Sequence, residues 1–451
     1  MKNLNFEDTI CAITTGGGKS AVAIIRISGN KSICICNSIF SKNILNQRSH
    51  TIHFGTIKED NNIIDEVLVS LFHQNKSFTG EESVEISCHG SIYIQNKILE
   101  LLIKKGCRIA GPGEFSMRSF KNGKIDLSQA ESITDLIASE SKLEHKTALH
   151  QLRGGFKKEL EELRQQLIDF TSLIELELDF SEEDVEFAQR DQLLELLNKI
   201  KIKLIHLIQS FKLGNVIKNG IPVAILGPPN AGKSTLLNKL LNEEKAIVSD
   251  IAGTTRDIIE DEINIEGFRF RFIDTAGIRN TKEIIESIGI KKSFQKAKEA
   301  SIVIFLMDAS TDIRKQKKEL EKIKKNTQSH ILIVVNKIDI KLSSYKNNNE
   351  IEISAKNNSG LEKLKSTLVK NITDKNISNE GTVITNIRHY EELQLTLHEI
   401  NIVIDGLNNM LSEDLISANI RHALIHLGSI TGEISTDELL GNIFSNFCIG
   451  K

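Results

Sequence analysis

The 451-residue sequence lacks the features that mark membrane, secreted and polybasic proteins. Its longest aliphatic and aromatic runs, such as IVIFLM at 302–307, have the length of a strand and are far too short to cross a bilayer. The N-terminal stretch MKNLNFEDTI has no apolar signal segment, so we expect a cytoplasmic protein. The formal net charge of −3 argues against a polybasic coat for nucleic acid, although it leaves room for a local basic patch.

Cysteine is sparse, and its spacing does not indicate a metal site. The six cysteines include no CxxC pair and no zinc-like spacing with histidine, and without an export signal we expect reduced thiols. In SICIC the cysteines alternate with isoleucines, so we expect Cys34 and Cys36 to share one face of a strand or of a helix end. The last cysteine, Cys448, lies three residues before Lys451. Because chain ends usually tolerate change, a thiol there needs an explanation.

The chain is too long for one hydrophobic core, and its patterning changes along its length. Residues 1–120 alternate short strand-like runs with glycine-containing turns, which predicts an α+β domain. Residues 121–214 carry apolar residues at three- and four-residue intervals, which predicts helices. Residues 215–376 alternate strands with helices, and residues 377–451 return to helical periodicity. This order predicts an α/β domain inserted into an all-α domain.

The stretch GPPNAGKST (227–235) follows the strand-like IPVAIL and precedes a helix-like run. It matches the phosphate-binding pattern G-x-x-x-x-G-K-[ST] in the strand–loop–helix context that this pattern requires. Gly227 and Gly232 would let backbone N–H groups face the phosphates, and the helix N-terminus adds positive potential. Lys233 would pair with the β- and γ-phosphates, and the Ser234 hydroxyl would bind Mg²⁺.

Three further motifs of GTP-binding proteins follow in the expected order. DTAG ends a strand, with Asp274 suited to the Mg²⁺ shell and the Gly277 amide to the γ-phosphate. NKID (336–339) ends another strand, and the Asp339 carboxylate can accept two N–H groups of guanine that adenine does not offer. SAK (354–356) supplies a last base-contacting loop. Together the motifs favour GTP as the nucleotide.

The segment SDIAGTTRD (249–257) occupies the position of switch I. Thr255 is the candidate second Mg²⁺ ligand, and Thr254 is the competing choice. Inside the P-loop, the amide oxygen of Asn230 could help to hold a monovalent cation near the β- and γ-phosphates. Other GTPases use an arginine finger at that place.

A glutamine that many GTPases use in catalysis is missing from these nucleotide-binding motifs. In Ras-like enzymes a glutamine directly after the D-x-x-G glycine orients the attacking water, but here that residue is Ile278. An aliphatic side chain cannot position water. Glu283 and Glu286, a few residues downstream, are the acidic candidates for this role.

The nucleotide motifs alone fit many GTPases, but GPGEF (111–115) together with a terminal CIGK indicates a far narrower group of proteins. With these residues the sequence resembles the MnmE (TrmE) family, GTPases that modify the wobble uridine of certain tRNAs. The resemblance covers essentially the full chain. Its segments are AVAIIRISG (21–29), SFTGEESVEISCHG (77–90), GPGEFSMRSFKNGKIDLSQAESITDLI (111–137), GPPNAGKST, SDIAGTTRD, DTAGIR, NKID and FCIGK.

The resemblance implies a domain plan that agrees with the patterning. Residues 1–120 would bind a tetrahydrofolate and dimerise. Residues 121–214 and 377–451 would form the two parts of the helical domain, with the CIGK motif at its end. Residues 215–376 would be the inserted Ras-like G domain.

The resemblance also implies a folate site. Arg26, Glu85, Lys124 and Lys451 fall where the family contacts 5-formyl-tetrahydrofolate. This set is chemically reasonable, because a pterin needs a carboxylate for its N–H groups and a folate needs basic groups for its carboxylates. The family pattern T-P-x-G-x-G is here TTGGGKS (14–20), without the proline, so we expect a looser turn and a changed folate affinity.

For the G domain the resemblance selects Glu286, twelve residues after Asp274, as the catalytic glutamate, and Ser234 and Thr255 as Mg²⁺ ligands. The K⁺ ligands that it implies are Asn230, Ser249, Ile251 and Thr254. The GTP-contacting positions that it implies are Asn230, Ala231, Gly232, Lys233, Ser234, Thr235, Ser249, Asp250, Ile251, Ala252, Gly253, Thr254, Thr255, Asp274, Thr275, Ala276, Gly277, Asn336, Lys337, Asp339, Ser354, Ala355 and Lys356.

The function implied by the resemblance is K⁺-stimulated GTP hydrolysis coupled to tRNA modification. A methylene-tetrahydrofolate would supply one carbon to C5 of the wobble uridine (position 34), giving a carboxymethylaminomethyl-type group. The implied partners are a second copy of the chain, tRNA and the FAD-dependent flavoprotein MnmG (GidA) in a heterotetramer. The chain itself has no flavin or NAD fingerprint, which agrees with a redox cofactor on the partner.

Two rival functions fit parts of the sequence. The first is a ribosome-assembly or signalling GTPase whose flanking domains bind RNA or protein. It predicts no folate binding and no role for Cys448. The second is a folate-binding regulatory module with a residual G domain, and the intact Lys233, Asp274 and Glu286 speak against it.

The terminal FCIGK has three interpretations. Its cysteine is fourth from the end, as in the prenylation frame C-a-a-X, but Gly450 and Lys451 fit that frame poorly and no polybasic stretch precedes it. Phe447 and Ile449 could instead bury a leftover thiol in the helical core. The resemblance favours delivery of the Cys448 thiol to the folate and uridine chemistry, as nucleophile or as general acid or base.

Overall fold

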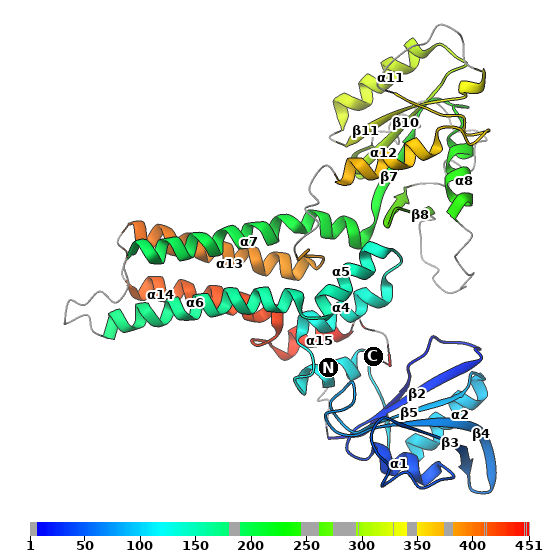
Figure 1. The fold of residues 1–451 in the computed structure, drawn as a ribbon, viewed down its shortest axis with the longest axis vertical. Coiled ribbons are helices and arrows are strands. Elements are labelled where there is room, and N and C mark those ends of the chain that lie inside the picture. Colours follow the sequence, from blue (N-terminus) through cyan, green and yellow to red (C-terminus); the bar gives the residue numbers. More distant parts are fainter. Residues whose placement is uncertain are drawn as a thin grey trace. The chain divides into compact units, whose positions relative to one another are not determined.

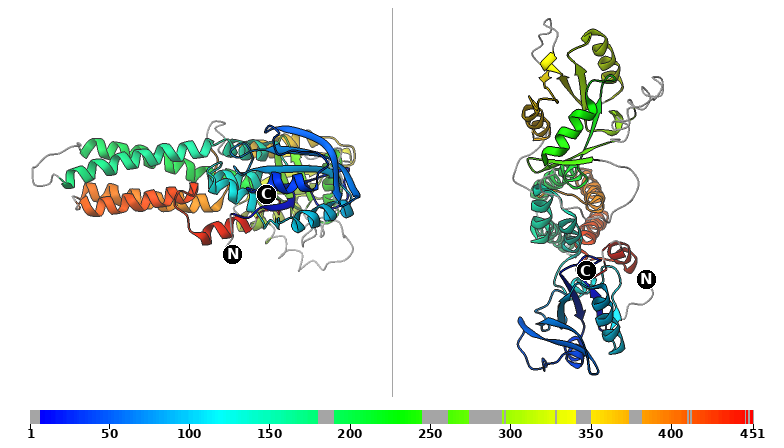
Figure 2. Two further views of the ribbon diagram at one scale, coloured as in Figure 1. Left: turned by 90° about the horizontal axis from the view of Figure 1, so that it is seen from below. Right: turned by 90° about the vertical axis from the view of Figure 1, so that its right-hand side faces the viewer.

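The computed structural model describes residues 7–179, 190–244, 261–273, 295, 297–327, 329–340, 350–373, 382–409, 411, 413–445, 447 and 449–450. Two compact units divide the chain (Figures 1 and 2). The first comprises Met1–Ile137, Ala148–Leu204 and Glu391–Lys451, and the second Ala138–Thr147 and Ile205–Tyr390. Most of the second unit is therefore inserted between two parts of the first along the sequence. No helix within the described ranges is long and apolar enough to cross a membrane.

The first unit begins with a six-stranded sheet of order β3-β4-β5-β2-β1-β6. Its strands are β1 (Ile10–Ile13), β2 (Val22–Ser28), β3 (Thr51–Glu59), β4 (Asn62–Phe72), β5 (Ser83–His89) and β6 (Arg108–Ile109). All neighbouring strands are antiparallel except β1 and β6, which are parallel. Helices α1 (Ser32–Ile39) and α2 (Ile92–Lys104) pack on one face and share its hydrophobic core.

Alternating side chains give this sheet two different faces. Ala23, Ile25 and Ile27 of β2 are buried in the core under α1 and α2. Successive side chains of a strand point to opposite faces, so the intervening residues lie on the other side, which we call the open face. On β2 and β5 the open face consists of Val22, Ile24, Arg26, Glu85, Ser87 and His89.

The expectation for the SICIC segment was wrong. These residues belong to helix α1, in which Cys36 is buried in the core and Cys34 is exposed. In a helix, residues two apart lie on nearly opposite sides, so an alternation that suits a strand separates the two thiols here.

The remaining helices of the first unit follow the sheet in the sequence. Helices α3 (Glu114–Lys121) and α15 (Asp437–Ser445) share a small core that includes Met117 and Phe444. Helices α6 (Gly155–Asp179) and α14 (Glu413–Thr431) run side by side (Figure 1). The other helices are α4 (Leu127–Ala138), α5 (Lys142–Leu152), α7 (Arg190–Asn219) and α13 (Ile387–Asn408), and each of these four has residues in both units.

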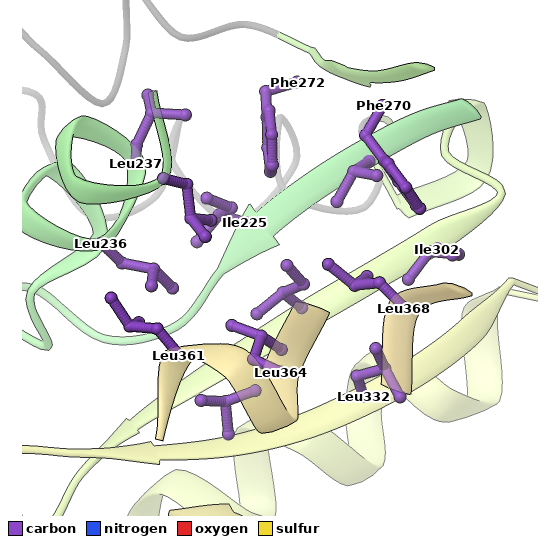
Figure 3. Close-up of a cluster of buried hydrophobic side chains, with 14 of the residues drawn as sticks. Ile225, Leu236, Leu237, Phe270, Phe272, Ile302, Leu332, Leu361, Leu364 and Leu368 are labelled. Carbon is purple, nitrogen blue, oxygen red and sulfur yellow. The ribbon is translucent and has the colours of Figure 1, made fainter. Parts of the chain in front are cut away.

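The second unit is built around a second six-stranded sheet, of order β12-β11-β10-β7-β9-β8. All its pairs are parallel except β8 with β9. Its strands are β7 (Ile221–Leu226), β8 (Asp261–Ile265), β9 (Phe268–Phe272), β10 (Ile302–Asp308), β11 (His330–Asn336) and β12 (Ile351–Glu352). Helices α8 (Lys233–Glu244) and α12 (Leu361–Thr373) cover one face, as Figure 3 shows, and α11 (Ile313–Asn326) contributes to the core of the other.

This architecture confirms the fold class expected from the sequence. The strand-like runs AVAIIRIS, DEVLVSLF and SVEISC fall on β2, β4 and β5, and IVIFLMD and ILIVVNK fall on β10 and β11. The apolar residues of β10 are buried without interruption, as a strand covered on both faces requires. The proposed domain limits differ from the two packed units and stay a prediction.

Candidate functional site

The loop between β7 and α8 follows a path that requires glycine at two positions. Gly227 has a φ of 141° and Gly232 a φ of 93°. A Cβ atom on Gly227 would overlap the carbonyl oxygen of Leu306, and one on Gly232 would overlap the side-chain nitrogen of Asn336. The loop therefore lies tightly against β10 and β11 at the N-terminus of α8, where backbone N–H groups can meet phosphate oxygens.

Lys233 begins α8 and turns back over this loop. Its ammonium group donates to the carbonyl oxygens of Gly227 at 2.7 Å and of Pro228 at 2.8 Å. The charge is thus held beside the position where a β- or γ-phosphate would lie. Asn230 is exposed with a φ of 62°, a left-handed conformation that asparagine tolerates well, so its amide is accessible to a ligand.

The buried amide of Asn336 connects three of the predicted motifs. Its side chain is 2% exposed. The amide nitrogen donates to the Ala231 carbonyl oxygen at 2.8 Å, and the amide oxygen accepts from the Ala355 N–H at 2.9 Å. One side chain therefore sets the spacing between the phosphate loop, the NKID strand end and the SAK loop.

The Asp339 carboxylate can act as a hydrogen-bond acceptor. The Ser354 hydroxyl donates to its carboxylate at 2.7 Å. This hydrogen bond is the main reason why the pKa of Asp339 lies below its ordinary value. The carboxylate stays ionised near neutral pH and can receive two N–H groups of a guanine ring.

The neighbouring Lys337 makes an ion pair that sequence reasoning missed. Its ammonium nitrogen lies 2.6 Å from a carboxylate oxygen of Asp308, at the end of β10. Burial alone would raise the pKa of Asp308, but hydrogen bonds from Lys337 and Ser310 outweigh it and lower the pKa. The only available sequence signal was an aspartate at the carboxyl end of a parallel strand, where ligand-binding residues gather.

Several predicted site residues lie outside the described residues. These are Ser249, Asp250, Ile251, Ala252, Gly253, Thr254, Thr255, Asp274, Thr275, Ala276, Gly277, Glu286, Cys448 and Lys451. Ser234 and Thr235 lie in the first turn of α8 at the phosphate loop, and Lys356 is exposed in the loop after β12. Among the residues that the structure describes, no group of three or more His, Cys, Asp or Glu could hold a metal ion. The Mg²⁺ and K⁺ ligand sets stay predictions.

Arg26 and Glu85 form an ion pair on the open face of the first sheet. They are directly paired on β2 and β5, with 2.9 Å between the Arg26 Nε and a carboxylate oxygen of Glu85. The guanidinium also lies over the Phe78 ring at 5.4 Å and the Phe115 ring at 5.6 Å. The pair is partly exposed, at 20% for Arg26 and 25% for Glu85, so it can exchange hydrogen bonds with a planar, polar ligand.

The end of the chain reaches the same part of the first unit. Ile449 forms a bridge with Pro112, and a Cβ atom on Gly450 would overlap the carbonyl oxygen of Ile13, the last residue of β1. Phe447 lies against Gly113. The described neighbours of Cys448 thus contact the GPGEF turn, whose Phe115 lies against Arg26.

The fourth predicted folate residue, Lys124, lies to one side of this pair. Its ammonium group donates to the Asn75 carbonyl oxygen at 3.1 Å, and its side chain packs near Gly80. Asn75 and Gly80 flank Phe78 in the loop between β4 and β5, where the Asn75 N–H donates to the Gly80 carbonyl oxygen. Lys124 therefore belongs to the neighbourhood of Phe78 rather than to the Arg26–Glu85 pair itself.

Comparison with known proteins agrees with these observations. A family model described as the MnmE helical domain matches residues 127–448, and one described as the GTP-binding protein TrmE N-terminus matches residues 9–124. The tRNA modification GTPases MnmE of Flavobacterium psychrophilum and Flavobacterium johnsoniae are each 53% identical to this chain over 99% of its length, and 100% and 99% of those proteins are covered. That of Bacteroides thetaiotaomicron is 49% identical over 99% of this chain and 100% of its own.

Among solved structures, the FeoB G-domain from Methanococcus jannaschii covers 34% of this chain and 98% of its own length, at 22% identity and a TM-score of 0.25. The family models account for nearly all of the sequence, and the curated relatives are about half identical from end to end. The described loops carry the glycines, the lysine and the aspartate expected of a GTP site. The chain belongs to the MnmE (TrmE) family of tRNA modification GTPases.

Proposed function

We propose that the protein is a K⁺-stimulated GTP hydrolase that modifies C5 of the wobble uridine of certain tRNAs. With an FAD-dependent MnmG partner it adds a carboxymethylaminomethyl-type group, using a one-carbon unit from methylene-tetrahydrofolate. It acts in the cytoplasm, as a homodimer within a heterotetramer. The observation that carries this proposal is the convergence of the Arg26–Glu85 pair, the GPGEF turn and the chain end in the first unit.

The GTPase reaction follows from the phosphate loop and its neighbours. The loop N–H groups and Lys233 would hold the triphosphate, and the Ser234 and Thr255 hydroxyls would bind Mg²⁺, which would supply charge neutralisation at the phosphates. Asn230, with Ser249, Ile251 and Thr254 of switch I, would hold K⁺. Glu286 positions the attacking water, the task that Ile278 cannot perform. The described geometry of Lys233 and Asn230 supports the roles proposed for these two residues.

The open face of the first sheet supports the proposed folate site. Glu85 would accept hydrogen bonds from the pterin N–H groups, and Arg26, whose guanidinium lies over the Phe78 and Phe115 rings, would orient Glu85 and contact pterin acceptor atoms. The residues on both sides of Cys448 lie against the turn that carries Phe115. A thiol at position 448 would therefore be delivered close to the bound folate, where it can serve the one-carbon transfer to uridine.

The experiment measures tRNA modification and GTP hydrolysis separately. Cys448→Ser is introduced into a strain that lacks its own enzyme of this family, and modified wobble uridine is measured by nucleoside mass spectrometry. GTP turnover is measured on the purified variant. We expect modification to be lost while GTP turnover stays within about twofold, because residue 448 is remote in sequence from every G motif. Cys34→Ser, which removes an exposed thiol elsewhere, is the matched control.

Two results would contradict the proposal. Unchanged modification in Cys448→Ser would exclude the proposed role of the thiol. Failure of the wild-type protein to bind 5-formyl-tetrahydrofolate, with Glu85→Gln as the reference variant that cannot bind it, would favour a ribosome-assembly or signalling GTPase.

A further inference from the structure

The open face of the first sheet carries a two-strand strip that extends beyond the Arg26–Glu85 pair. Three cross-strand pairs of β2 and β5 compose it: Arg26 with Glu85, Ile24 with Ser87, and Val22 with His89. Residues two apart on a strand point the same way, so all six side chains belong to one face. We call these residues the β2–β5 strip.

The chemistry of the strip changes from one end to the other. Arg26 and Glu85 offer charged hydrogen-bonding groups. Ile24 and Val22 follow along β2 and form an apolar floor, and Val22 is 55% exposed although it lies on a paired strand. His89 stands at the far end. A ligand that lay along the strip would meet a polar, an apolar and again a polar environment.

His89 is held by the buried carboxylate of Asp65. Asp65 is 9% exposed, and its two oxygens contact the His89 N–H at 2.8 Å and the His89 Nδ1 at 2.7 Å. Because Asp65 fixes the ring through Nδ1, the second ring nitrogen, Nε2, points away from it. The His89 side chain is 69% exposed, so Nε2 is available to a ligand.

The end of β5 is also fixed from the other side. The Ser20 N–H donates to the Gly90 carbonyl oxygen at 3.1 Å, and the Gly90 N–H donates to the Ala21 carbonyl oxygen at 3.3 Å. A Cβ atom on Gly90 would overlap Ser20, so residue 90 must be glycine for the loop to approach. His89 is therefore presented on a rigid strand end, which suits a ligand-contacting residue.

The length of the strip fits a folate. Four residues separate Glu85 from His89, which corresponds to about 13 Å of strand. A tetrahydrofolate consists of a pterin, an aminobenzoyl ring and a glutamate in that order, that is, a hydrogen-bonding, an apolar and an anionic part. The β2–β5 strip presents complementary groups in the same order.

We propose that His89, positioned by Asp65, binds the glutamate carboxylate of the tetrahydrofolate whose pterin is held at Arg26 and Glu85. The aminobenzoyl ring lies over Ile24 and Val22. This inference rests on the proposed folate site and gives the bound cofactor a direction along the sheet. The opposite direction leads to Lys124, whose ammonium group is bonded to the Asn75 carbonyl oxygen in the loop around Phe78.

The test pairs a protein change with a ligand change. The full chain is titrated calorimetrically with 5-formyl-tetrahydrofolate and with 5-formyl-tetrahydropteroate, which lacks the glutamate. We expect wild-type protein to bind the complete folate about tenfold more tightly. In His89→Gln this preference falls to less than twofold, because only the complete folate loses affinity. Lys124→Gln tests the opposite direction along the sheet. His53→Gln, a change at a histidine of β3 whose ring contacts the Thr51 hydroxyl, is the matched control and keeps the wild-type preference.

Asp65→Asn checks the positioning role of the carboxylate. We expect it to reduce the preference for the glutamate-bearing ligand while binding of the pteroate is unchanged, a pattern that general destabilisation does not produce. An undiminished preference in His89→Gln, or a preference lost in Lys124→Gln instead, would overturn the inference while the folate site itself stands. Absence of binding of both ligands to wild-type protein would overturn the proposed function and the inference together.

Discussion

At the scale of single residues, the buried amide of Asn336 connects parts of the chain that are about 105 and 19 residues away in sequence. Its two hydrogen bonds fix the Ala231 carbonyl and the Ala355 N–H. Asn336→Ala would leave both groups without this partner in a site where water is largely excluded. We expect the free energy of unfolding of the second unit to fall by about 1–3 kcal/mol, as measured by urea denaturation.

The same change should weaken GTP binding, because the phosphate loop and the base-contacting loop are no longer held at a fixed spacing. A fluorescent GTP analogue measures this affinity in titrations. Asn326→Ala is the control, since the Asn326 amide donates to the Lys322 carbonyl oxygen at the exposed end of α11. Equal effects of both substitutions on stability and on affinity would show that Asn336 does not organise the site.

At the scale of elements, helix α3 is anchored at its N-terminus by charged side chains. Glu114 accepts from the Gly111 N–H at 2.8 Å and lies 2.6 Å from Arg108 and 3.1 Å from Arg118. Burial alone would raise the pKa of Glu114, but hydrogen bonds from Arg108 and Gly111 outweigh it and lower the pKa. Asp8, between Arg108 and Arg118, has its pKa lowered for the same reason.

This anchor predicts a loss of stability in acid. Because the pKa values of Glu114 and Asp8 are lower in the folded state than their unfolded values of about 4, both carboxylates stabilise the fold above pH 4. The stabilisation is lost as the pH falls through the folded-state values. Calorimetric unfolding temperatures between pH 7 and pH 3 should show a drop below about pH 4 that is shallower in Glu114→Gln. Glu100→Gln, a change at an exposed carboxylate of α2, should give the same pH profile as the wild type. Parallel profiles for all three proteins would show that Glu114 does not stabilise the fold in this way.

The anchor also illustrates what the sequence could and could not predict. The phosphate loop was predictable because its glycines and Lys233 are contiguous and fall between a strand and a helix. The ion pair between Arg118 and Asp8 joins residues 110 apart in sequence, so no local pattern indicates it. Glu114 and Arg118 read as an ordinary helical pair, and only the fold shows that both are buried. The same limit applies to Asp65, which no motif connects with His89.

Arg269 on β9 links the β8–β9 hairpin to Glu144 and to the end of α7. The Arg269 side chain is 17% exposed and lies 3.0 Å from the carboxylate of Glu144, which is 7% exposed. It also donates to the Lys218 carbonyl oxygen at 2.7 Å. Breaking a largely buried ion pair leaves a charge without compensation, so Arg269→Gln should lower the free energy of unfolding of the second unit by about 3 kcal/mol in urea denaturation.

An arginine in an exposed position provides the comparison for this hairpin. Arg314→Gln changes an exposed side chain of α11 and should alter the same free energy by less than about 0.5 kcal/mol. If the Arg269 variant is as stable as the Arg314 variant, the hairpin does not depend on the ion pair.

At the scale of the whole molecule, the proposed homodimer needs an apolar surface that a single chain leaves uncovered. The first sheet offers such a surface on β3 and β4, the two strands at one of its edges: Ile52 is 66% exposed, Phe54 56% and Leu68 46%. Phe54 and Leu68 are directly paired across β3 and β4, so they form one continuous patch. Because β3 is an edge strand, the patch lies where a second copy of the chain can pack against it.

Phe54→Asp places a charge in the centre of this patch and should convert dimers to monomers in sedimentation velocity experiments. The thermal unfolding temperature of the monomer should change little, because Phe54 is more than half exposed in the isolated chain. Ile202→Asp is the matched control: Ile202 is 67% exposed but lies on α7, so this variant should remain dimeric. Dimers of unchanged stability in Phe54→Asp would place the dimer contact on another surface. Monomers in both variants would mean that added negative charge, rather than loss of the patch, separates the chains.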